Sequence, residues 1–363
     1  MNYLSPLAAS LVPYVPGEQP RGRKLVKLNT NENAYPPSPA VVEALRTVSE
    51  GIAPYDVLRL YPDPTCLALR ETVAAMHGVT ADWVFVGNGS DEVLAFAFAA
   101  FFAQGRVAMP ELGYSFYPVY AKLFQAEPLY GPVDEALVVD AEALLALGAP
   151  VILANPNAPT SRALPRETAL DLARRLHARG QVYVVDEAYA DFGHCSILDA
   201  CPTLDNLLVV RTLSKSHALA GLRVGYAVGH PDLIDGLTRI KDSFNSYTLD
   251  VLALTGAKAA LEDHAYAKAR IAEICRVRDR TREALLALGM QVPPSETNFL
   301  FARHPRASGK ALFLALRERD ILVRHFDTPR LREYLRISIG TEAQMDWVVE
   351  TMRTLLTEMG CLP

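Results

Sequence analysis

The sequence has little cysteine, only five in 363 residues. These cysteines are odd in number, scattered and without a C-x-x-C pair, which excludes a small disulfide-stapled fold and favours reduced thiols. Cys195 follows His194 directly, but two adjacent ligands do not make a zinc site. We therefore expect no bound metal.

The sequence also lacks an excess of positive charge, because 36 Lys and Arg stand against 41 Asp and Glu, a formal net charge of −5. This charge balance does not predict the positively charged surface that binds nucleic acid or an anionic membrane. The longest apolar stretch, 93–103, is too short to cross a bilayer and follows two acidic residues, so we expect a buried helix there. The N-terminus has no basic flank before an apolar core, so we expect a cytoplasmic protein without a signal peptide.

No internal repeat or low-complexity block is visible. Half of the residues are apolar, enough to bury a core that is divided between two domains. We expect an N-terminal arm and small-domain entry over residues 1–40, a large domain over 41–250 and a small C-terminal α+β domain over 251–363.

Between residues 64 and 241, helix-period segments alternate with short apolar runs. The runs are apolar on both faces, as strands covered by helices on each side must be. We therefore predict an α/β fold with a mostly parallel sheet sandwiched by helices. The expected strands are 83–86, 107–109, 151–154, 182–185, 207–211 and 224–228, and the expected helices are 64–77, 91–103, 114–124, 166–179 and 231–241.

After residue 249 the pattern changes to long amphipathic helices followed by short strands. The expected helices are 252–261, 266–288 and one from about 342, and the expected strands are 298–302, 321–324 and 335–338. The boundary between the two domains predicts a cleft. Ligands of open α/β sheets bind beyond the carboxyl ends of the strands, so polar residues at those ends are the candidate site.

Two strand ends carry a set of residues that suits one cofactor. Asp186 ends one strand, and Thr212, Ser214 and Lys215 follow the next, with Arg223 eight residues further on. A lysine can form a Schiff base with an aldehyde, two hydroxyls and an arginine can hold a phosphate dianion, and a buried carboxylate can keep a pyridine nitrogen protonated. Taken singly, the carboxylate could cap a helix and the lysine could be a surface residue. Together they indicate pyridoxal 5′-phosphate.

Two more segments follow strands and face the same edge, and Tyr189 lies three residues beyond Asp186. Gly89, Ser90 and Asp91 open a helix whose backbone N–H groups favour an anion, whereas Glu92 replaces the third glycine of a dinucleotide fingerprint. Tyr114 could stack on a flat ring or line the rim. Tyr189 could bond the phenolic oxygen of the cofactor ring.

These residues resemble the fold-type I pyridoxal-phosphate aminotransferases, class I/II, and within them the histidinol-phosphate aminotransferase group. The resemblance covers nearly the whole chain, and its most specific part is the string S-K-x-x-x-L-x-G-L-R-x-G-Y. Its segments are 11–14, 28–33, 214–226, 294–299 and 335–341.

The resemblance implies a role for each matching residue. Lys215 would form the Schiff base and move the proton, with Asp186 and Tyr189 as its catalytic neighbours. Ser214 and Arg223 would help to hold the cofactor, Ser90 and Asp91 would cradle its phosphate by backbone, and Tyr114 would stack on its ring. Tyr61 would reach the cofactor phosphate of the neighbouring subunit, which makes a homodimer with shared active sites part of the expectation.

The resemblance also implies a substrate end. Arg324 and Arg336 would bind a carboxylate or a phosphate, because a guanidinium offers either group two parallel bonds. Tyr14 on the arm would close over the substrate, and Asn31, which lies in a matching segment, would also bind it. Without the resemblance, either arginine could form a structural salt bridge.

Two segments depart from the family pattern. Where the family has Asn-Pro-Thr-Gly, this chain has Ala158-Pro159-Thr160-Ser161, so the usual amide is missing and Asn157 is the candidate substitute. The loop 243–247 also differs, and it should border the substrate side chain.

The expected activity is a ping-pong transamination from L-histidinol phosphate to 2-oxoglutarate in histidine biosynthesis, giving imidazole acetol phosphate and L-glutamate. An aromatic amino acid aminotransferase or a decarboxylase of O-phospho amino acids would fit the same residues. A non-catalytic regulator would need a DNA-binding segment for which the chain has no room.

Overall fold

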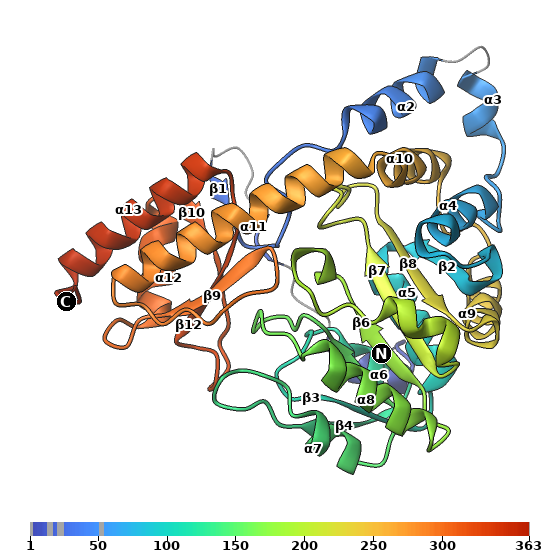
Figure 1. Cartoon of the computed structure of the whole chain (residues 1–363), viewed down its shortest axis with the longest axis horizontal. Helices are drawn as coiled ribbons and strands as arrows, with labels where there is room; N and C mark the ends of the chain where they lie inside the picture. The colour runs from blue at the N-terminus through green and yellow to red at the C-terminus, as the bar shows by residue number, and fades with distance from the viewer. Residues whose placement is uncertain (1–2, 13–16, 20–24, 51–53, 363) are drawn as a thin grey trace.

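The computed structural model describes residues 3–12, 17–19, 25–50 and 54–362 (Figure 1). Its largest sheet has seven strands in the order β2-β8-β7-β6-β5-β3-β4. β8 runs antiparallel to β2 and β7, and the other pairs are parallel, which confirms the predicted, mostly parallel α/β sheet. The strands are β2 (Val84–Asn88), β3 (Arg106–Pro110), β4 (Glu127–Gly131), β5 (Val151–Ala154), β6 (Tyr183–Asp186), β7 (Leu207–Thr212) and β8 (Val224–Gly229).

Helices cover both faces of this sheet, as the doubly apolar strands require. Successive strand residues point to opposite faces, so Val184 lies in one buried cluster while Val185 lies in the other. One face packs against α5 (Gly89–Phe101), α6 (Tyr117–Leu123) and α9 (Pro231–Phe244). The other packs against α2 (Pro39–Glu50), α4 (Leu67–His77), α7 (Ala141–Ala146), α8 (Arg166–His177) and α10 (Val251–Glu262).

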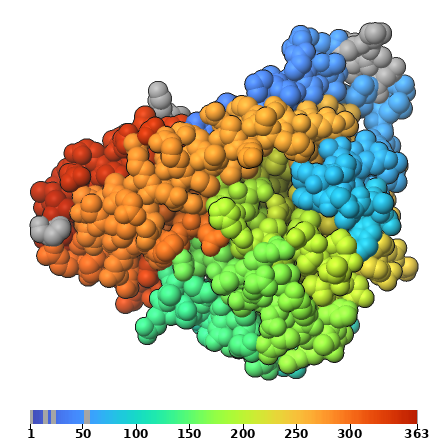
Figure 2. Space-filling view, viewed as in Figure 1, coloured from blue at the N-terminus to red at the C-terminus, as the bar shows by residue number. Residues whose placement is uncertain are grey.

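The C-terminal part forms a second body with its own core. Its antiparallel sheet has the order β11-β12-β9, and β1 pairs in parallel with β10 beside it. Figure 2 shows this body and the C-terminal helices packed directly against the large body. The elements are β1 (Val26–Lys27), α11 (His264–Ala287), β9 (Phe299–Arg303), α12 (Gly309–Glu318), β10 (Ile321–Leu322), β11 (Arg324–His325), β12 (Tyr334–Ser338) and α13 (Glu342–Glu358).

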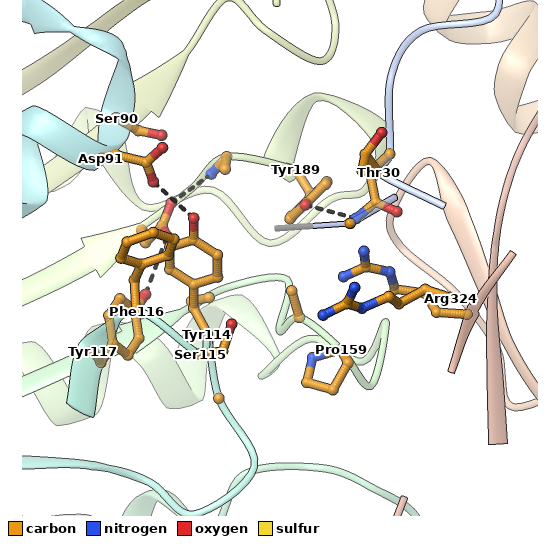
Figure 3. A pocket seen from close by; sticks show the side chains of 18 of the residues that line it. Thr30, Ser90, Asp91, Tyr114, Ser115, Phe116, Tyr117, Pro159, Tyr189 and Arg324 are labelled. Carbon is orange, nitrogen blue, oxygen red and sulfur yellow. Dashed lines mark hydrogen bonds between the residues drawn. The ribbon is translucent and has the colours of Figure 1, made fainter. Parts of the chain in front are cut away.

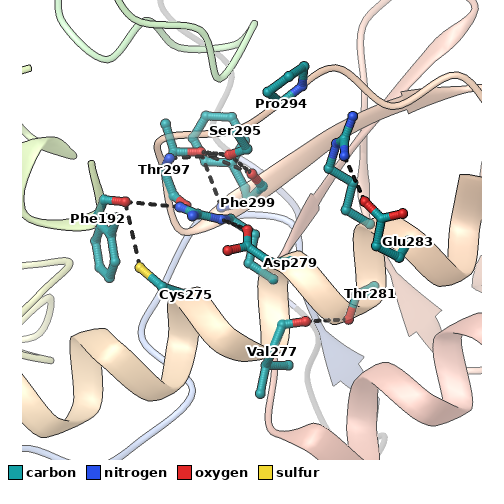
Figure 4. Close-up of polar contacts among 12 residues, drawn as sticks. Phe192, Cys275, Val277, Asp279, Thr281, Glu283, Pro294, Ser295, Thr297 and Phe299 are labelled. Carbon is teal, nitrogen blue, oxygen red and sulfur yellow. Dashed lines mark hydrogen bonds and ion pairs between the residues drawn. The ribbon is translucent and has the colours of Figure 1, made fainter. Parts of the chain in front are cut away.

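The long helix α11 holds the two bodies together. The buried Arg278 guanidinium donates through Nη1 to the carbonyl oxygens of Phe192 and Thr297, each at 3.0 Å (Figure 4). Phe192 belongs to the segment that follows β6, whereas Thr297 precedes β9. One buried arginine therefore fixes the start of the small sheet against the loop that leaves the large one.

Every strand and helix expected between residues 64 and 241 has a counterpart in the structure, with ends shifted by a few residues. The expected strand 321–324 was wrong as a single unit, because β10 pairs with β1 and β11 pairs with β12. Several elements were not expected, among them α1 (Pro6–Ser10), α3 (Pro54–Arg59) and the short helices η1 (Ala81–Trp83), η2 (Ala190–Phe192) and η3 (Leu198–Thr203).

The predicted domain boundaries stay predictions. Ala253, Ala257 and Leu261 of α10 pack in the core of the large sheet, although the boundary at residue 250 assigns them to the small domain. Their packing favours a boundary further along the chain. Among the described residues, no helix combines the length and the apolar character that a membrane span needs.

Candidate active site

A cavity of about 610 Å³ lies between the carboxyl ends of the large sheet and the small sheet. Figure 3 shows Ser90 and Asp91 at one end of it and Arg324 at the other. The predicted residues that line it are Asn31, Ser90, Asp91, Tyr114, Asp186, Tyr189, Thr212, Ser214, Lys215, Arg223, Arg324 and Arg336. Chain segments more than 300 residues apart in the sequence thus form one site, at the place expected from the strand ends.

The end of the cavity at α5 is suited to an anion. The residue before this thirteen-residue helix, Asn88, makes no side-chain cap hydrogen bond, so the first backbone N–H groups and the positive end of the helix dipole favour an anion there. Arg223 lies beside it, with Nη2 3.3 Å from Asp91 Oδ2 and Nη1 3.3 Å from Ser214 Oγ. Thr212 Oγ1 donates to Ser214 Oγ at 3.0 Å. Two hydroxyls, a guanidinium and a helix N-terminus therefore converge, as a phosphate dianion requires.

Gly89 makes this arrangement possible. Its φ is +80°, and a Cβ at this position would collide with Nη2 of Arg223. Gly225 on β8 plays a similar part, because a Cβ there would meet the backbone N of Ser90. The two glycines let the helix start, the strand and the guanidinium approach closely.

Asp186 is a buried carboxylate at the end of β6. Its Oδ1 accepts from the backbone N–H of Ala188, and its Oδ2 accepts from the hydroxyl of Tyr117, both at 3.1 Å. Burial raises the pKa of Asp186 to about 7, although these two hydrogen bonds act in the opposite direction. No ion pair to Asp186 is found among the described residues, so a cation from a ligand would satisfy it.

Lys215 is the buried amine of the site. Burial, followed by the Arg336 guanidinium, lowers the pKa of Lys215 to about 8. Its Nζ donates to the carbonyl oxygen of Thr30 at 3.2 Å, and Asn33 Nδ2 donates to the Lys215 carbonyl at 2.8 Å. A depressed pKa leaves more of the amine neutral near pH 7, the form that attacks an aldehyde.

Two tyrosines approach the cavity from opposite sides. Tyr114 donates to Asp91 Oδ1 at 2.7 Å, so its ring is tied to the start of α5. The hydroxyl of Tyr189 accepts from Asn31 Nδ2 at 2.9 Å. The structure thus joins Asn31, predicted to bind substrate, directly to a residue predicted to bind the cofactor.

The two arginines at the far end come from paired strands. Arg324 on β11 is the register partner of Arg336 on β12. The Arg336 guanidinium lies 5.3 Å from the ring centre of Phe299 and 5.6 Å from that of Phe326, and its Nη2 donates to the Asn29 carbonyl at 3.1 Å. Two aromatic rings and a backbone carbonyl thus orient the Arg336 guanidinium at the cavity wall. A guanidinium there suits an acidic group of a substrate.

Among the described residues, three predicted ones do not line the cavity of this chain, namely Gly89, Asn157 and Tyr61. Asn157 is buried and donates through Nδ2 to the Leu112 carbonyl at 2.8 Å and to Thr160 Oγ1 at 3.0 Å, while Ala158 and its proline neighbour line the wall instead. Tyr61 is 81% exposed and stacks on Tyr247, with ring centres 4.5 Å apart. Tyr14 lies outside the described residues.

The sequence reasoning missed Tyr117 and Thr30, which contact Asp186 and Lys215 respectively. Tyr117 stands at the start of α6, three residues after the predicted Tyr114 and thus on the same side of that turn, a spacing that could have pointed to it. Thr30 contributes a carbonyl oxygen, which no side-chain pattern marks.

Comparison with known proteins identifies the class. Residues 23–352 match the family model described as "Aminotransferase class I and II", so the chain belongs to this family of pyridoxal-phosphate-dependent aminotransferases. The match spans both bodies and every predicted residue that lines the cavity, and it confirms the enzyme class and the cofactor that the sequence predicted.

The similar curated proteins point to one group within the family. The histidinol-phosphate aminotransferase of Chromohalobacter salexigens is 49% identical over 98% of this chain and 99% of its own. Histidinol-phosphate aminotransferase 2 of Thiobacillus denitrificans is 51% identical over 98% of each chain.

Solved structures agree with the family. The histidinol-phosphate aminotransferase of Sinorhizobium meliloti, in complex with pyridoxal-5′-phosphate, is 26% identical, with a TM-score of 0.86 over 98% of this chain and 99% of its own. The L-threonine-O-3-phosphate decarboxylase of Porphyromonas gingivalis, 24% identical with a TM-score of 0.78 over 92% of this chain and 100% of its own, shows the fold alone.

The residues of this chain fit the cofactor. Asp186 is a buried carboxylate that a protonated ring nitrogen would pair, and the buried Lys215 has a depressed pKa. The hydroxyls of Thr212 and Ser214, together with Arg223, match a phosphate dianion. Each polar feature of pyridoxal phosphate thus has a chemically matched partner at the cavity wall.

Proposed function

We propose that this chain transfers the amino group of L-histidinol phosphate to 2-oxoglutarate, giving imidazole acetol phosphate and L-glutamate in histidine biosynthesis. The observation that carries the proposal is the 49–51% identity, over nearly whole chains, to curated histidinol-phosphate aminotransferases. The cavity supports it, because a cation-lined end lies opposite the cofactor's phosphate end.

The side chains divide the work by position. Bound pyridoxal phosphate supplies an aldehyde that takes the amino group and a protonated ring that accepts electron density. Lys215 Nζ would take the proton from the substrate carbon that bears the amine and deliver it to the carbon that was the cofactor's aldehyde carbon. The Asp186 carboxylate keeps the ring nitrogen protonated, while Ser214 and Arg223 hold the phosphate.

Arg324 and Arg336 hold the other end of the substrate in this proposal. A guanidinium binds phosphate or carboxylate by two parallel hydrogen bonds. The phosphate of the donor and a carboxylate of 2-oxoglutarate can therefore use the same place in turn. The rings of Phe299 and Phe326 lie against the Arg336 guanidinium and help to hold it in place.

We also propose a homodimer in which each copy completes the other's site. Tyr61 does not line the cavity of its own chain, and apolar side chains close in sequence to Tyr61 or to its stacking partner Tyr247 are exposed. The exposed fractions are 72% for Leu58, 59% for Leu60 and 76% for Phe244. Burial of these groups against a second copy would stabilise the pair.

A cytoplasmic location is part of the same proposal. All five cysteines are free in the structure, and unpaired thiols suit a reducing compartment. Fractionation of the native cell, followed by detection of the protein, tests this location.

The test of the reaction uses the purified protein loaded with pyridoxal phosphate. Addition of L-histidinol phosphate without an acceptor should abolish the visible absorbance of the bound cofactor, and later addition of 2-oxoglutarate should restore it with release of L-glutamate. L-Tyrosine and L-threonine O-phosphate serve as comparison donors under the same conditions.

The other outcomes separate the alternatives. A faster response to L-tyrosine would make the chain an aromatic aminotransferase. Carbon dioxide released from L-threonine O-phosphate without use of 2-oxoglutarate would make it a decarboxylase. Stable visible absorbance with every donor would contradict catalysis altogether.

A further inference from the structure

Asn31 sits at the junction of the arm and both bodies. It is 1% exposed, and its φ of +56° is a left-handed conformation that asparagine and glycine tolerate best. Its carbonyl oxygen accepts from Asn298 Nδ2 at 3.0 Å, and its backbone N–H donates to Ser338 Oγ at 2.9 Å. The backbone at this position is therefore held by a residue of β12 and by the residue that precedes β9.

The hydrogen bonds around Asn31 have a single consistent direction. Because Ser338 Oγ accepts from the Asn31 backbone, its own proton is left for Asn31 Oδ1, 3.1 Å away. Oδ1 is then the acceptor, so Nδ2 is the atom that faces the Tyr189 hydroxyl at 2.9 Å. The Tyr189 oxygen accepts a hydrogen bond from Asn31, so the hydroxyl's own proton points away from Asn31.

The O–H bond of Tyr189 can point into the cavity. Tyr189 lines the cavity, and its ring packs edge-on against Phe299, with centres 5.2 Å apart. The ring position is thus held by packing, whereas the direction of the hydroxyl proton is set by Asn31. The loop after β5 offers no side-chain donor here, since Ala158 lines the wall and the Asn157 amide donates to Leu112.

We propose that Asn31 is a positioning residue that makes the Tyr189 hydroxyl a hydrogen-bond donor to the phenolic oxygen of bound pyridoxal phosphate. Ser338 sets the orientation of the Asn31 amide and so acts one step further back. The inference rests on the cofactor and not on the proposed amino donor, and its test needs no substrate.

The expected effect concerns a proton that the phenolic oxygen shares with the nitrogen joining Lys215 to the cofactor. A hydrogen bond donated to that oxygen weakens its hold on the shared proton, so the proton leaves at lower pH. Loss of the bond should raise the pH midpoint of the visible absorbance change. The charged groups that face Lys215 and Tyr189 are Arg336, Asp91, Glu32, Arg223 and Asp186, and the variants below keep all of them.

The experiment is a pH titration of the absorbance of the loaded protein. Asn31→Gly keeps the left-handed backbone accessible and removes the donor, and it should raise the midpoint by about one pH unit. Asn31→Asp places an acceptor before Tyr189, turns the hydroxyl proton away from the cavity and should raise the midpoint at least as far. Ser338→Ala frees the amide and should give a smaller shift in the same direction.

Tyr189→Phe supplies the matched background. In it, Asn31→Gly should leave the midpoint unchanged, because the hydroxyl that Asn31 positions is gone. Asn31→Asp should retain only the part of its shift that its charge causes. Equal shifts of Asn31→Gly in both backgrounds, or no shift in either, would overturn the proposal. Ser338→Ala gives the same test if the Asn31 variants fail to fold.

Discussion

The role that we propose for Asp186 toward the cofactor has a cost for the stability of the protein without cofactor. Its carboxyl is fully enclosed, and burial raises its pKa from an ordinary 3.8 to about 7. Between about pH 4 and pH 7 the folded protein therefore binds more protons at this group than the unfolded chain does. The free energy of unfolding falls as the pH rises through this window.

Asp186→Asn should therefore stabilise the protein purified without cofactor, and more so at pH 8 than at pH 5, by a difference of about 1–3 kcal/mol. The same variant should lose transamination, since an amide does not hold a ring nitrogen protonated. Urea unfolding of both proteins at the two pH values measures the difference. An equal effect at both would contradict a raised pKa, and saturating cofactor should reverse the order of stability.

At this scale the sequence predicted most of the polar site and missed parts of its support. Asp186 and Lys215 were predictable because one ends a buried strand and the other follows one. Ligands of open α/β sheets bind at that edge, so polar side chains there are candidate site residues. Asn157 was the candidate substitute for a missing amide, but its Nδ2 faces the Leu112 carbonyl. Which way a loop amide turns depends on neighbours from another segment, and residue type alone does not encode it.

At the scale of elements, the start of α5 forms the end of the cavity that we propose for the cofactor phosphate. The left-handed backbone of Gly89 and its lack of a Cβ let Arg223 lie against the first turn. Gly89→Ala should displace the guanidinium and weaken cofactor binding by about tenfold, as for loss of a charged hydrogen bond. Spectroscopic titration with pyridoxal phosphate measures the dissociation constant.

Gly78→Ala is the matched control for backbone strain. Gly78 ends α4 with a similar φ of +68°, and a Cβ there would meet nothing within 4 Å. Both substitutions should lower stability by about 1 kcal/mol, but Gly78→Ala should leave the dissociation constant unchanged. Equal weakening by both would mean that general strain, and not the displaced arginine, is responsible.

The elements that the sequence predicted share a strong local pattern, and those that it missed lack one. β5 was predicted with its observed bounds because all four of its residues are apolar and buried. β4 was missed because its sequence, EPLYG, contains a proline and a partly exposed pattern, as edge strands often do. β1 has only two residues and exists through its pairing with β10, some 295 residues away, which no local window can reveal.

At the scale of the whole molecule, one cavity depends on three parts of the chain. The arm provides the Thr30 carbonyl for Lys215, the large sheet provides Lys215, and the small sheet provides Arg336, which in turn donates to the arm at Asn29. β1 also joins the arm to the small body. Substrate and cofactor would therefore contact all three parts, and a dimer would add a fourth.

The proposed fourth part is Tyr61 of a second copy, and a mixture of two inactive variants tests it. In a hybrid of Lys215→Ala and Tyr61→Ala subunits, the site that keeps Lys215 would receive an intact Tyr61 from its partner, whereas the other site would lack both. When equal amounts of the two variants are refolded together, about half of the dimers should be hybrids. Each hybrid has one intact site out of two, so the activity should return to roughly one quarter of the native value.

The controls are the two variants refolded alone, each of which should be close to inactive. If Tyr61 served its own chain, the subunit with Lys215 would always lack Tyr61, and mixing would restore nothing. A Tyr61→Ala protein that is fully active alone would remove Tyr61 from the site. Recovery of activity on mixing would show that Tyr61 of one chain completes the site of the other, because no single chain in the mixture has both Lys215 and Tyr61.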